Sequence, residues 1–193
     1  MSELKRIAIF FSGRGGSAEN LIKSSKYQKI YTVDLLICSD ANAPGIERLS
    51  DHGIPISVVP WDRSKTSHEL SSECFRLCDE ALIDVVCLAG WLKQLVLPPN
   101  WGSKVLNIHP SLLPDYGGKG MYGIKVHQSV IECGEKISGC TVHLIDNELD
   151  RGTILGQSKI EVANNDTPTT LQEKIYKLEL DLYPQVLLNF LSN

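Results

Sequence analysis

Mostly apolar runs alternate with amphipathic stretches along the first half of the chain, and the run at residues 7–11 is wholly apolar. The runs lie at residues 7–11, 32–38, 54–59, 84–90 and 104–108. Strands buried on both faces of a parallel sheet have this mostly apolar character, whereas strands with one solvated face alternate apolar and polar residues. The pattern therefore predicts five strands of a mainly parallel sheet.

Helical patterns fill the segments between and after these runs. We expect helices at residues 18–27, 45–53, 66–82 and 124–133. A last amphipathic helix is expected at residues 168–192, capped by Asp166 or Thr167 and bent at Pro184. Strands that alternate with helices predict an α/β fold.

The pattern changes after the fifth run. Residues 139–145 and 153–162 predict two strands joined by a short polar loop, which suits an antiparallel pair. The expected fold is a Rossmann-like, mainly parallel sheet with an antiparallel C-terminal extension and helices on both faces. A chain of 193 residues suits one core, so residues 1–193 are expected to form a single domain.

Composition and charge narrow the possible partners and compartments. The net charge is -4 and no basic stripe is present, which argues against nucleic acid as a partner. The apolar run near the N-terminus has five residues, too few for a signal peptide or a membrane span, so we expect a cytoplasmic protein without a membrane association. The six cysteines contain no C-x-x-C pair and are expected to be reduced and mostly structural.

Two polar residues end the fifth predicted strand. Asn107 and His109 are two residues apart, so their side chains are expected on the same face of the strand. An amide N–H and an imidazolium can both stabilise the oxyanion that forms when an amine attacks a carbonyl carbon. The simpler alternative is that both residues cap the turn that follows.

A carboxylate beside the histidine would favour the catalytic interpretation. A neighbouring negative charge raises the pKa of a histidine and fixes its tautomer. Asp150, in the polar loop between the two last predicted strands, is the carboxylate that we expect in this position. A solvated turn and an incomplete calcium loop are the alternatives for this segment.

A glycine-rich turn follows the first strand. Gly13, Gly15 and Gly16 lie between a predicted strand and a predicted helix, where backbone N–H groups and the helix dipole favour an anion such as phosphate. A tight turn without a ligand is the alternative. Gly13, Gly15 and Ala18 also satisfy G-x-G-x-x-A, and Asp40 follows the second strand, so an NAD-binding dehydrogenase is a competing hypothesis.

Two further segments leave predicted strands without a regular pattern. The segment after Gly90 contains Trp91 and is either one wall of a ligand cleft or part of the core. Residues 114–123 are rich in glycine, and long loops of this kind are usually functional. His127, in the helix that follows, is expected to be an ordinary surface or packing residue.

Five short motifs resemble the folate-dependent formyltransferases, and within that family the phosphoribosylglycinamide (GAR) formyltransferases of purine biosynthesis. The motifs are IAIFFSG at residues 7–13, LAGW at 88–91, NIHPSLLP at 107–114, ELDRG at 148–152, and Tyr183-Pro184. They span nearly the whole chain, and NIHPSLLP is the most specific of them. The resemblance implies an enzyme.

The resemblance implies a reaction and its catalytic residues. A formyl group passes from 10-formyltetrahydrofolate, the co-substrate, to the amine of glycinamide ribonucleotide, giving formylglycinamide ribonucleotide and tetrahydrofolate without a metal ion. By this comparison Asn107 and protonated His109 bind the oxyanion, and Asp150 supports His109 and helps to relay the proton. His143 matches a family histidine behind the active site, with a buried structural histidine as the alternative.

The same comparison assigns the binding residues. The substrate phosphate is expected on Gly15, Gly16 and Ser17, and the ribose on Glu179. The folate is expected between two sets of residues: Leu92, Lys93, Gln94 and Leu95 form the first, and Asn107 with the backbone of Asp146, Asn147 and Asp150 forms the second. Small molecules are the expected partners, and the protein is expected to be a monomer or a homodimer.

The sequence departs from the family pattern in three places. The usual Gly-Ser-Asn of the phosphate loop is Gly15-Gly16-Ser17 here, so phosphate binding is expected to depend more on backbone N–H groups, with Arg14 as a further candidate. The loop at residues 117–123 lacks the family's commoner histidine. The family's basic folate-side residue has no secure match within residues 63–65. A formyltransferase acting on the amine of a sugar nucleotide is the alternative within the family.

Overall fold

The computed structural model describes residues 4–62 and 64–192 of the chain. They belong to two compact units, residues 1–106 and residues 107–193, and strand β5 (Val105–His109) runs across the division. The expectation of a single domain stays a prediction.

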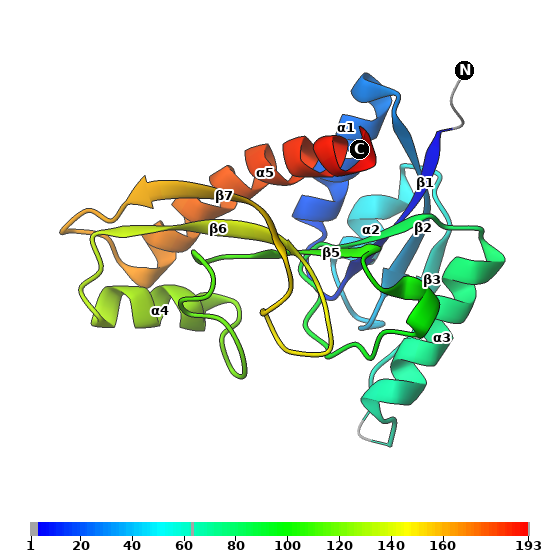
Figure 1. Cartoon of the computed structure of the whole chain (residues 1–193), viewed down its shortest axis with the longest axis horizontal. Helices are drawn as coiled ribbons and strands as arrows, with labels where there is room; N and C mark the ends of the chain where they lie inside the picture. Colours follow the sequence, from blue (N-terminus) through cyan, green and yellow to red (C-terminus); the bar gives the residue numbers. More distant parts are fainter. Residues whose placement is uncertain (1–3, 63, 193) are drawn as a thin grey trace. The chain divides into compact units, whose positions relative to one another are not determined.

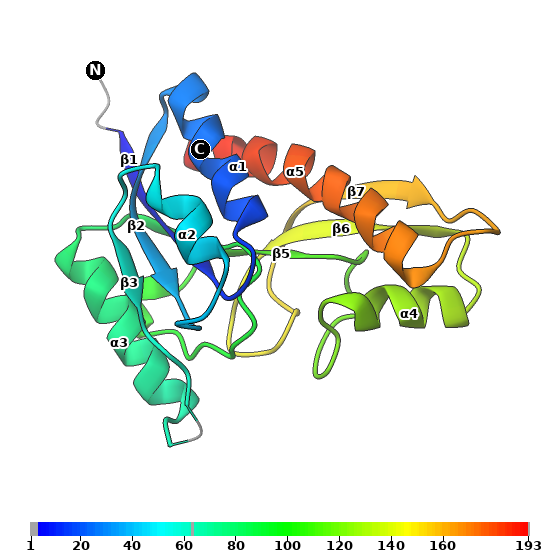
Figure 2. The same ribbon diagram turned by 180° about the vertical axis from the view of Figure 1, so that it is seen from behind.

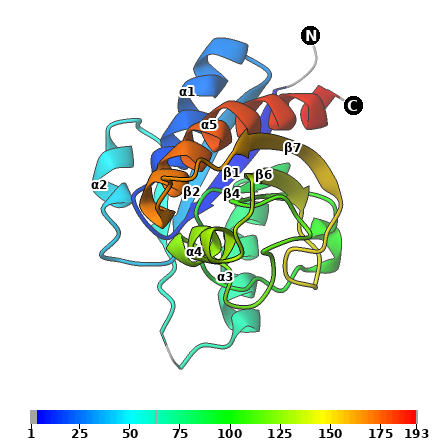
Figure 3. The same ribbon diagram turned by 90° about the vertical axis from the view of Figure 1, so that its left-hand side faces the viewer.

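A parallel sheet forms the centre of the first unit. Its strands follow the order β3-β2-β1-β4, and the beginning of β5 lies beyond β4. Their bounds are β1 (Lys5–Phe11), β2 (Tyr31–Cys38), β3 (Ile56–Val58) and β4 (Val85–Leu88). Strand β1 pairs in parallel with both β2 and β4, and the three strands lie side by side in Figure 3. The apolar runs therefore predicted the central strands, whereas β3 is shorter than its run.

Helices cover both faces of this sheet. They are α1 (Gly16–Gln28), α2 (Gly45–Ser50) and α3 (Ser67–Glu80), and a short 3-10 helix spans Pro99–Trp101 (Figure 2). Phe11 of β1 lies against α2, where a Cβ on Gly45 would come within 2.8 Å of its ring. The adjacent Phe10 packs on Phe75 of α3, with ring centroids 6.1 Å apart. Because neighbouring strand residues point to opposite faces, α2 and α3 cover opposite faces of β1.

An antiparallel pair forms the sheet of the second unit. Strands β6 (Ile137–Leu144) and β7 (Ile154–Glu161) pair from Ile137 opposite Glu161 to His143 opposite Ile154, with an irregularity between Val142 and His143. The end of β5 lies next to β6. The predicted antiparallel extension is confirmed.

Two helices complete the second unit, α4 (Ile124–Glu132) and α5 (Pro168–Ser192). Helix α5 lies along β6 and β7 (Figure 1). Gly156 of β7 permits this approach, because a Cβ there would come within 2.6 Å of Val186 on the helix. The hydroxyl of Thr167 accepts a hydrogen bond from the N–H of Thr170 and so caps α5, one of the two predicted caps. The helix continues through Pro184.

Candidate active site

Asn107 and His143 form the first contact of a polar cluster in the second unit. Nδ2 of Asn107, near the end of β5, lies 3.1 Å from Nε2 of His143 on β6, and His143 is completely buried. Nδ1 of His143 lies 2.9 Å from the carbonyl oxygen of Leu144, so this nitrogen carries the proton. Burial lowers the pKa of His143, which favours the neutral ring. Its Nε2 therefore accepts from Asn107 and fixes the orientation of that amide.

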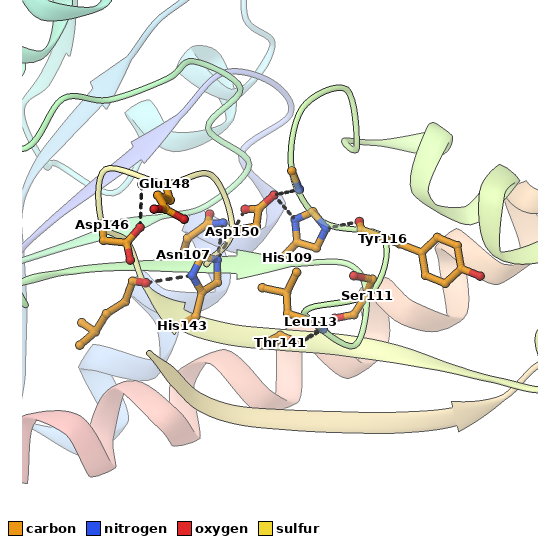
Figure 4. A network of polar contacts seen from close by, with 12 residues as sticks. Asn107, His109, Ser111, Leu113, Tyr116, Thr141, His143, Asp146, Glu148 and Asp150 are labelled. Carbon is orange, nitrogen blue, oxygen red and sulfur yellow. Dashed lines mark hydrogen bonds and ion pairs between the residues drawn. The ribbon is translucent and has the colours of Figure 1, made fainter. Parts of the chain in front are cut away.

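Asp150 joins this pair to the second catalytic candidate of β5. Its Oδ2 lies 3.6 Å from Nδ1 of His109, and its Oδ1 lies 3.7 Å from Nε2 of His143 (Figure 4). His109 is 5% exposed, so little solvent screens its interaction with the carboxylate. The structure brings together Asn107, His109, His143 and Asp150, as the sequence comparison implied.

Two backbone groups complete the cluster, and the sequence did not reveal either of them. The carbonyl oxygen of Tyr116 lies 2.9 Å from Nε2 of His109, and the N–H of Gly118 donates to Oδ2 of Asp150 at 2.8 Å. The glycines of this loop were the one feature of the sequence that could have indicated these contacts. A Cβ on Gly117 would come within 2.6 Å of Leu113 and 3.1 Å of Asp150, so a side chain would not fit there. The loop must therefore pass close to the carboxylate.

The partners of His109 determine its chemistry. The Tyr116 carbonyl requires a hydrogen on Nε2, and the carboxylate of Asp150 faces Nδ1. Both partners are acceptors, so the geometry suits an imidazolium that has a hydrogen on each nitrogen. The amide nitrogen of Asn107 has two hydrogens, of which the contact with His143 uses one. The cluster can therefore donate hydrogen bonds to a developing oxyanion and exchange a proton with the carboxylate.

The glycine turn of the first unit is part of a helix N-terminus. Helix α1 begins at Gly16, two residues earlier than predicted, so Gly16 and Ser17 lie in its first turn. Gly15 is the N-cap with φ 72° and is packed tightly, since a Cβ would come within 3.1 Å of Leu49. The first N–H groups of a helix have no partner within it, and the helix dipole favours an anion there. Arg14 is exposed beside this turn.

The loops after β1, β2 and β4 meet at the carboxyl edge of the first unit's sheet. The hydroxyl of Ser12 lies 2.7 Å from that of Ser39 and accepts a hydrogen bond from the N–H of Leu92 at 3.0 Å. Trp91 is buried and packs on Phe10 at 5.2 Å between ring centroids, so it belongs to the core and is not a wall of a cleft. Leu92 and its neighbours thus lie at the carboxyl edge of the sheet, where ligands of parallel α/β sheets usually bind.

The predicted folate residues differ in their exposure. In the first unit, Leu92 and Gln94 are exposed, Lys93 lies over the ring of Trp61 at 5.9 Å, and Leu95 is buried. In the second unit, Asp146 and Asn147 are both exposed. Oδ1 of Asp146 accepts a hydrogen bond from the N–H of Glu148, which shapes the turn that leads to Asp150.

Three other candidates have defined surroundings. Glu179 lies half-buried on α5, and burial raises its pKa to about 8. His127 on α4 is 1% exposed. It is therefore a packing residue, one of the two roles expected for it, and the expectation of a surface position is wrong. Arg63 lies outside the described residues, and Nζ of Lys65 forms an ion pair with Glu73 at 3.0 Å.

Sequence comparison agrees with this geometry. The model of the formyl transferase family matches residues 5–187 of the chain. The chain belongs to the formyl transferase family. The NIHPSLLP and ELDRG motifs, which contain Asn107, His109 and Asp150, lie within the matched region.

This formyl transferase is similar to proteins of purine biosynthesis. It is 38% identical over 186 residues to the chloroplastic phosphoribosylglycinamide formyltransferase of Arabidopsis thaliana, covering 94% of this chain and 64% of the relative. It is 34% identical over 185 residues to the trifunctional purine biosynthetic protein adenosine-3 of Homo sapiens, covering 94% of this chain and 18% of the relative. The chain thus spans less than two thirds of the length of these two relatives.

Solved structures of similar length share the fold. The phosphoribosylglycinamide formyltransferase of Bacillus halodurans superposes with a TM-score of 0.86 at 33% identity, covering 98% of this chain and 96% of that one. The enzyme of Brucella melitensis gives a TM-score of 0.85 at 30% identity, covering 99% and 97%. The predicted Rossmann-like fold and the predicted family are both confirmed.

Two findings concern metal ions and membranes. Across residues 4–62 and 64–192, no group of three His, Cys, Asp or Glu side chains is placed to hold a metal ion. Among the helices formed by these residues, none combines the length and the apolar character that a membrane span needs.

Proposed function

We propose that this formyl transferase moves a formyl group from 10-formyltetrahydrofolate to the amine of glycinamide ribonucleotide, a step of de novo purine biosynthesis. The observation that carries the proposal is the cluster of buried His109 with partly buried Asn107 and Asp150, whose donors and carboxylate suit attack of an amine on a carbonyl. The printed names of the relatives in Arabidopsis thaliana and Bacillus halodurans support the choice of substrate.

Asn107 and His109 would stabilise the oxygen of the carbonyl under attack. The donors are the second hydrogen of the Asn107 amide and the Nδ1–H of His109, because Nε2 is bound to the Tyr116 carbonyl. Nδ1 lies 3.6 Å from Asp150, too far for a hydrogen bond. His143 holds the Asn107 amide, so this donor is oriented before the substrate arrives. A preorganised donor in a buried site typically contributes a factor of about 100 to 1,000 in rate.

Asp150 would keep His109 charged and accept a proton. The attacking amine must lose a proton as its bond to the formyl carbon forms, and the carboxylate of Asp150 can receive it, directly or through a water molecule. The departing folate nitrogen takes up a proton as its bond to the formyl carbon breaks. The N–H of Gly118 holds Oδ2 of Asp150 within reach of His109.

The binding assignments follow the family comparison. The phosphate would be bound by backbone N–H groups of Gly15, Gly16 and Ser17 at the start of α1, and the ribose by Glu179. By the same comparison, the formyl donor would be bound by residues 92–95 of the first unit and by Asn107 and the backbone of Asp146, Asn147 and Asp150 of the second. When it is bound, this donor supplies the activated one-carbon group.

The test is direct turnover. The purified protein is mixed with glycinamide ribonucleotide and 10-formyltetrahydrofolate, and the absorbance of the folate product is followed. We expect turnover by the wild type, loss of nearly all activity in His109→Ala, and wild-type activity in His68→Ala, an exposed histidine on α3. An inactive wild type would refute the proposed reaction, and an active His109→Ala variant would refute the proposed role of His109.

Two further measurements separate the competing functions. Turnover with the amine of a sugar nucleotide in place of glycinamide ribonucleotide would favour the alternative within the family. Binding of NADH without binding of a folate analogue would favour a dehydrogenase, for which the turn at Gly13 and the acid Asp40 are the sequence basis.

Three expectations from the sequence stay predictions. They are a reaction without a metal ion, a monomeric or homodimeric protein, and a cytoplasmic location. The Arabidopsis thaliana relative is chloroplastic.

A further inference from the structure

Three hydrogen bonds from strands β6 and β7 hold the segment that connects His109 to Tyr116, and a fourth joins the two side chains that make them. Oγ1 of Thr141, on β6, donates to the carbonyl oxygen of Ser111 at 2.7 Å and accepts from the N–H of Leu113 at 3.0 Å. Nε2 of Gln157, on β7, donates to the carbonyl oxygen of Leu113 at 3.0 Å and to Oγ1 of Thr141 at 2.9 Å. Side chains from two neighbouring strands therefore bind the N–H and the carbonyl oxygen of Leu113.

The Thr141 hydroxyl is fully used by these contacts. A hydroxyl has one hydrogen and two lone pairs, and here it makes one donated and two accepted hydrogen bonds. Thr141 and Ser111 are both completely buried, so water cannot replace a lost partner at this point. Removal of the hydroxyl would leave buried backbone groups without partners, which the segment can relieve only by moving.

Gln157 complements Thr141 through its amide nitrogen. That nitrogen has two hydrogens, and they are directed to two acceptors, Leu113 and Thr141. A carboxylate in the same place would present lone pairs to both acceptors. The pattern of donors and acceptors therefore favours glutamine at this exposed position of β7.

The held segment reaches the catalytic histidine at both of its ends. It starts at His109 itself and ends at Tyr116, whose carbonyl oxygen binds Nε2 of His109 (Figure 4). A displacement of the segment moves this acceptor and changes the direction in which Nδ1 faces Asp150. Misplacement of a catalytic group by about 1 Å can reduce a rate by a factor of about 100.

We propose that Thr141 and Gln157 are positioning residues, which fix His109 by anchoring the segment from Ser111 to Leu113. The proposal rests on the formyl transfer proposed above. Neither residue is proposed to contact the substrate or the formyl donor.

The matched variants Thr141→Val and Thr141→Ser test it. Valine has nearly the shape of threonine without the hydroxyl, and serine keeps the hydroxyl. We expect Thr141→Val to lower kcat by a factor on the order of 10 to 100 with KM within about a factor of two, and Thr141→Ser to retain most of the activity. A purely structural role would reduce the folded fraction and leave kcat per folded molecule unchanged, which would overturn the proposal.

The variant Gln157→Met decides the outcome if Thr141→Val does not fold. Methionine has a similar length and no donors, and the exposed Lys159→Met on the same face of β7 is its control. We expect a reduced kcat for Gln157→Met and a wild-type kcat for Lys159→Met. Equal kcat values for the two variants would overturn the role of Gln157.

A spectroscopic measurement separates this proposal from the proposed function. The ¹⁵N chemical shift of Nε2 of His109 reports its hydrogen bond to Tyr116 without any substrate. We expect this signal to move in Thr141→Val and in Gln157→Met and to stay in Lys159→Met. An inactive wild type whose Nε2 signal responds in this way would refute formyl transfer alone, whereas an unchanged Nε2 signal in both variants would refute the positioning role.

Discussion

Oδ2 of Asp150 lies 3.6 Å from Nδ1 of His109 and is held there by the N–H of Gly118 at 2.8 Å. Asp150 itself has φ 57°, in the left-handed region that aspartate tolerates better than most residues. The carboxylate is therefore positioned by backbone conformation and by a backbone donor from a second loop.

This relationship predicts the effect of Asp150→Asn. The amide is nearly isosteric and can still accept from Gly118, so the fold should be retained. It has no negative charge to pair with an imidazolium and cannot take up a proton, so kcat should fall by a factor on the order of 100 or more. Steady-state kinetics and circular dichroism measure the two effects.

The control for Asp150→Asn is Glu148→Gln in the same loop. It makes the same acid-to-amide change at an exposed side chain and should leave kcat unchanged. If Asp150→Asn retained activity within a few-fold of the wild type, the carboxylate would have no part in proton transfer.

The strands could be predicted because burial on both faces leaves a direct record in the sequence. Residues 7–11 are all apolar and residues 32–38 mostly apolar, since these strands are largely buried, and the structure places β1 and β2 there. Boundaries were less certain because turns and helix ends depend on local backbone geometry. Helix α1 thus includes Gly16 and Ser17, which were expected in a turn.

The catalytic side chains could be selected from the sequence, but their backbone partners could not. Asn107, His109 and Asp150 have side chains whose chemistry suggests a role. The carbonyl of Tyr116 and the N–H of Gly118 are groups that almost every residue has, so only the folded loop identifies them. The side chains of Thr141 and Gln157 could not be identified either, because their partners are backbone groups of Ser111 and Leu113, far away in the sequence.

The glycine turn before α1 predicts an unequal response to alanine at two positions. Gly15 and Gly53 have nearly the same φ, 72° and 70°. A Cβ at Gly15 would come within 3.1 Å of Leu49 and 3.2 Å of Gly45, whereas nothing lies within 4 Å of one at Gly53. Gly53→Ala should therefore lower the free energy of unfolding by about 1 kcal/mol through backbone strain. Gly15→Ala should lower it by about 2–4 kcal/mol through strain and crowding together.

Urea denaturation of both variants measures this difference. Gly15→Ala should also weaken binding of glycinamide ribonucleotide, because the displaced turn contains the proposed phosphate donors, and Gly53→Ala should not. Equal losses of stability in the two variants would show that the turn at Gly15 adjusts to a side chain without crowding.

His127 predicts how stability depends on pH. The ring is 1% exposed on α4, and within the described part of the chain its Nδ1 has no hydrogen-bond partner. Burial, and then the nearby His109, lower the pKa of His127 to about 4, from 6.5 in an unfolded chain. Below pH 6.5 the unfolded chain therefore binds a proton that the native protein does not. The free energy of unfolding should fall by about 3 kcal/mol on this account as the pH decreases from 6.5 to 4.

The variant His127→Leu isolates this contribution. It has no titrating ring, so its free energy of unfolding should decrease less steeply than that of the wild type between pH 6.5 and 4. At pH 8 the wild-type ring is neutral in both states, and the difference between the two proteins there gives the packing cost of the substitution alone. Leucine also removes a buried nitrogen that has no partner, so this cost should be small for a core position. Parallel urea titrations at pH 8, 6 and 5 provide the comparison, and a constant difference between the two proteins at all three values would show that His127 does not resist protonation in the native state.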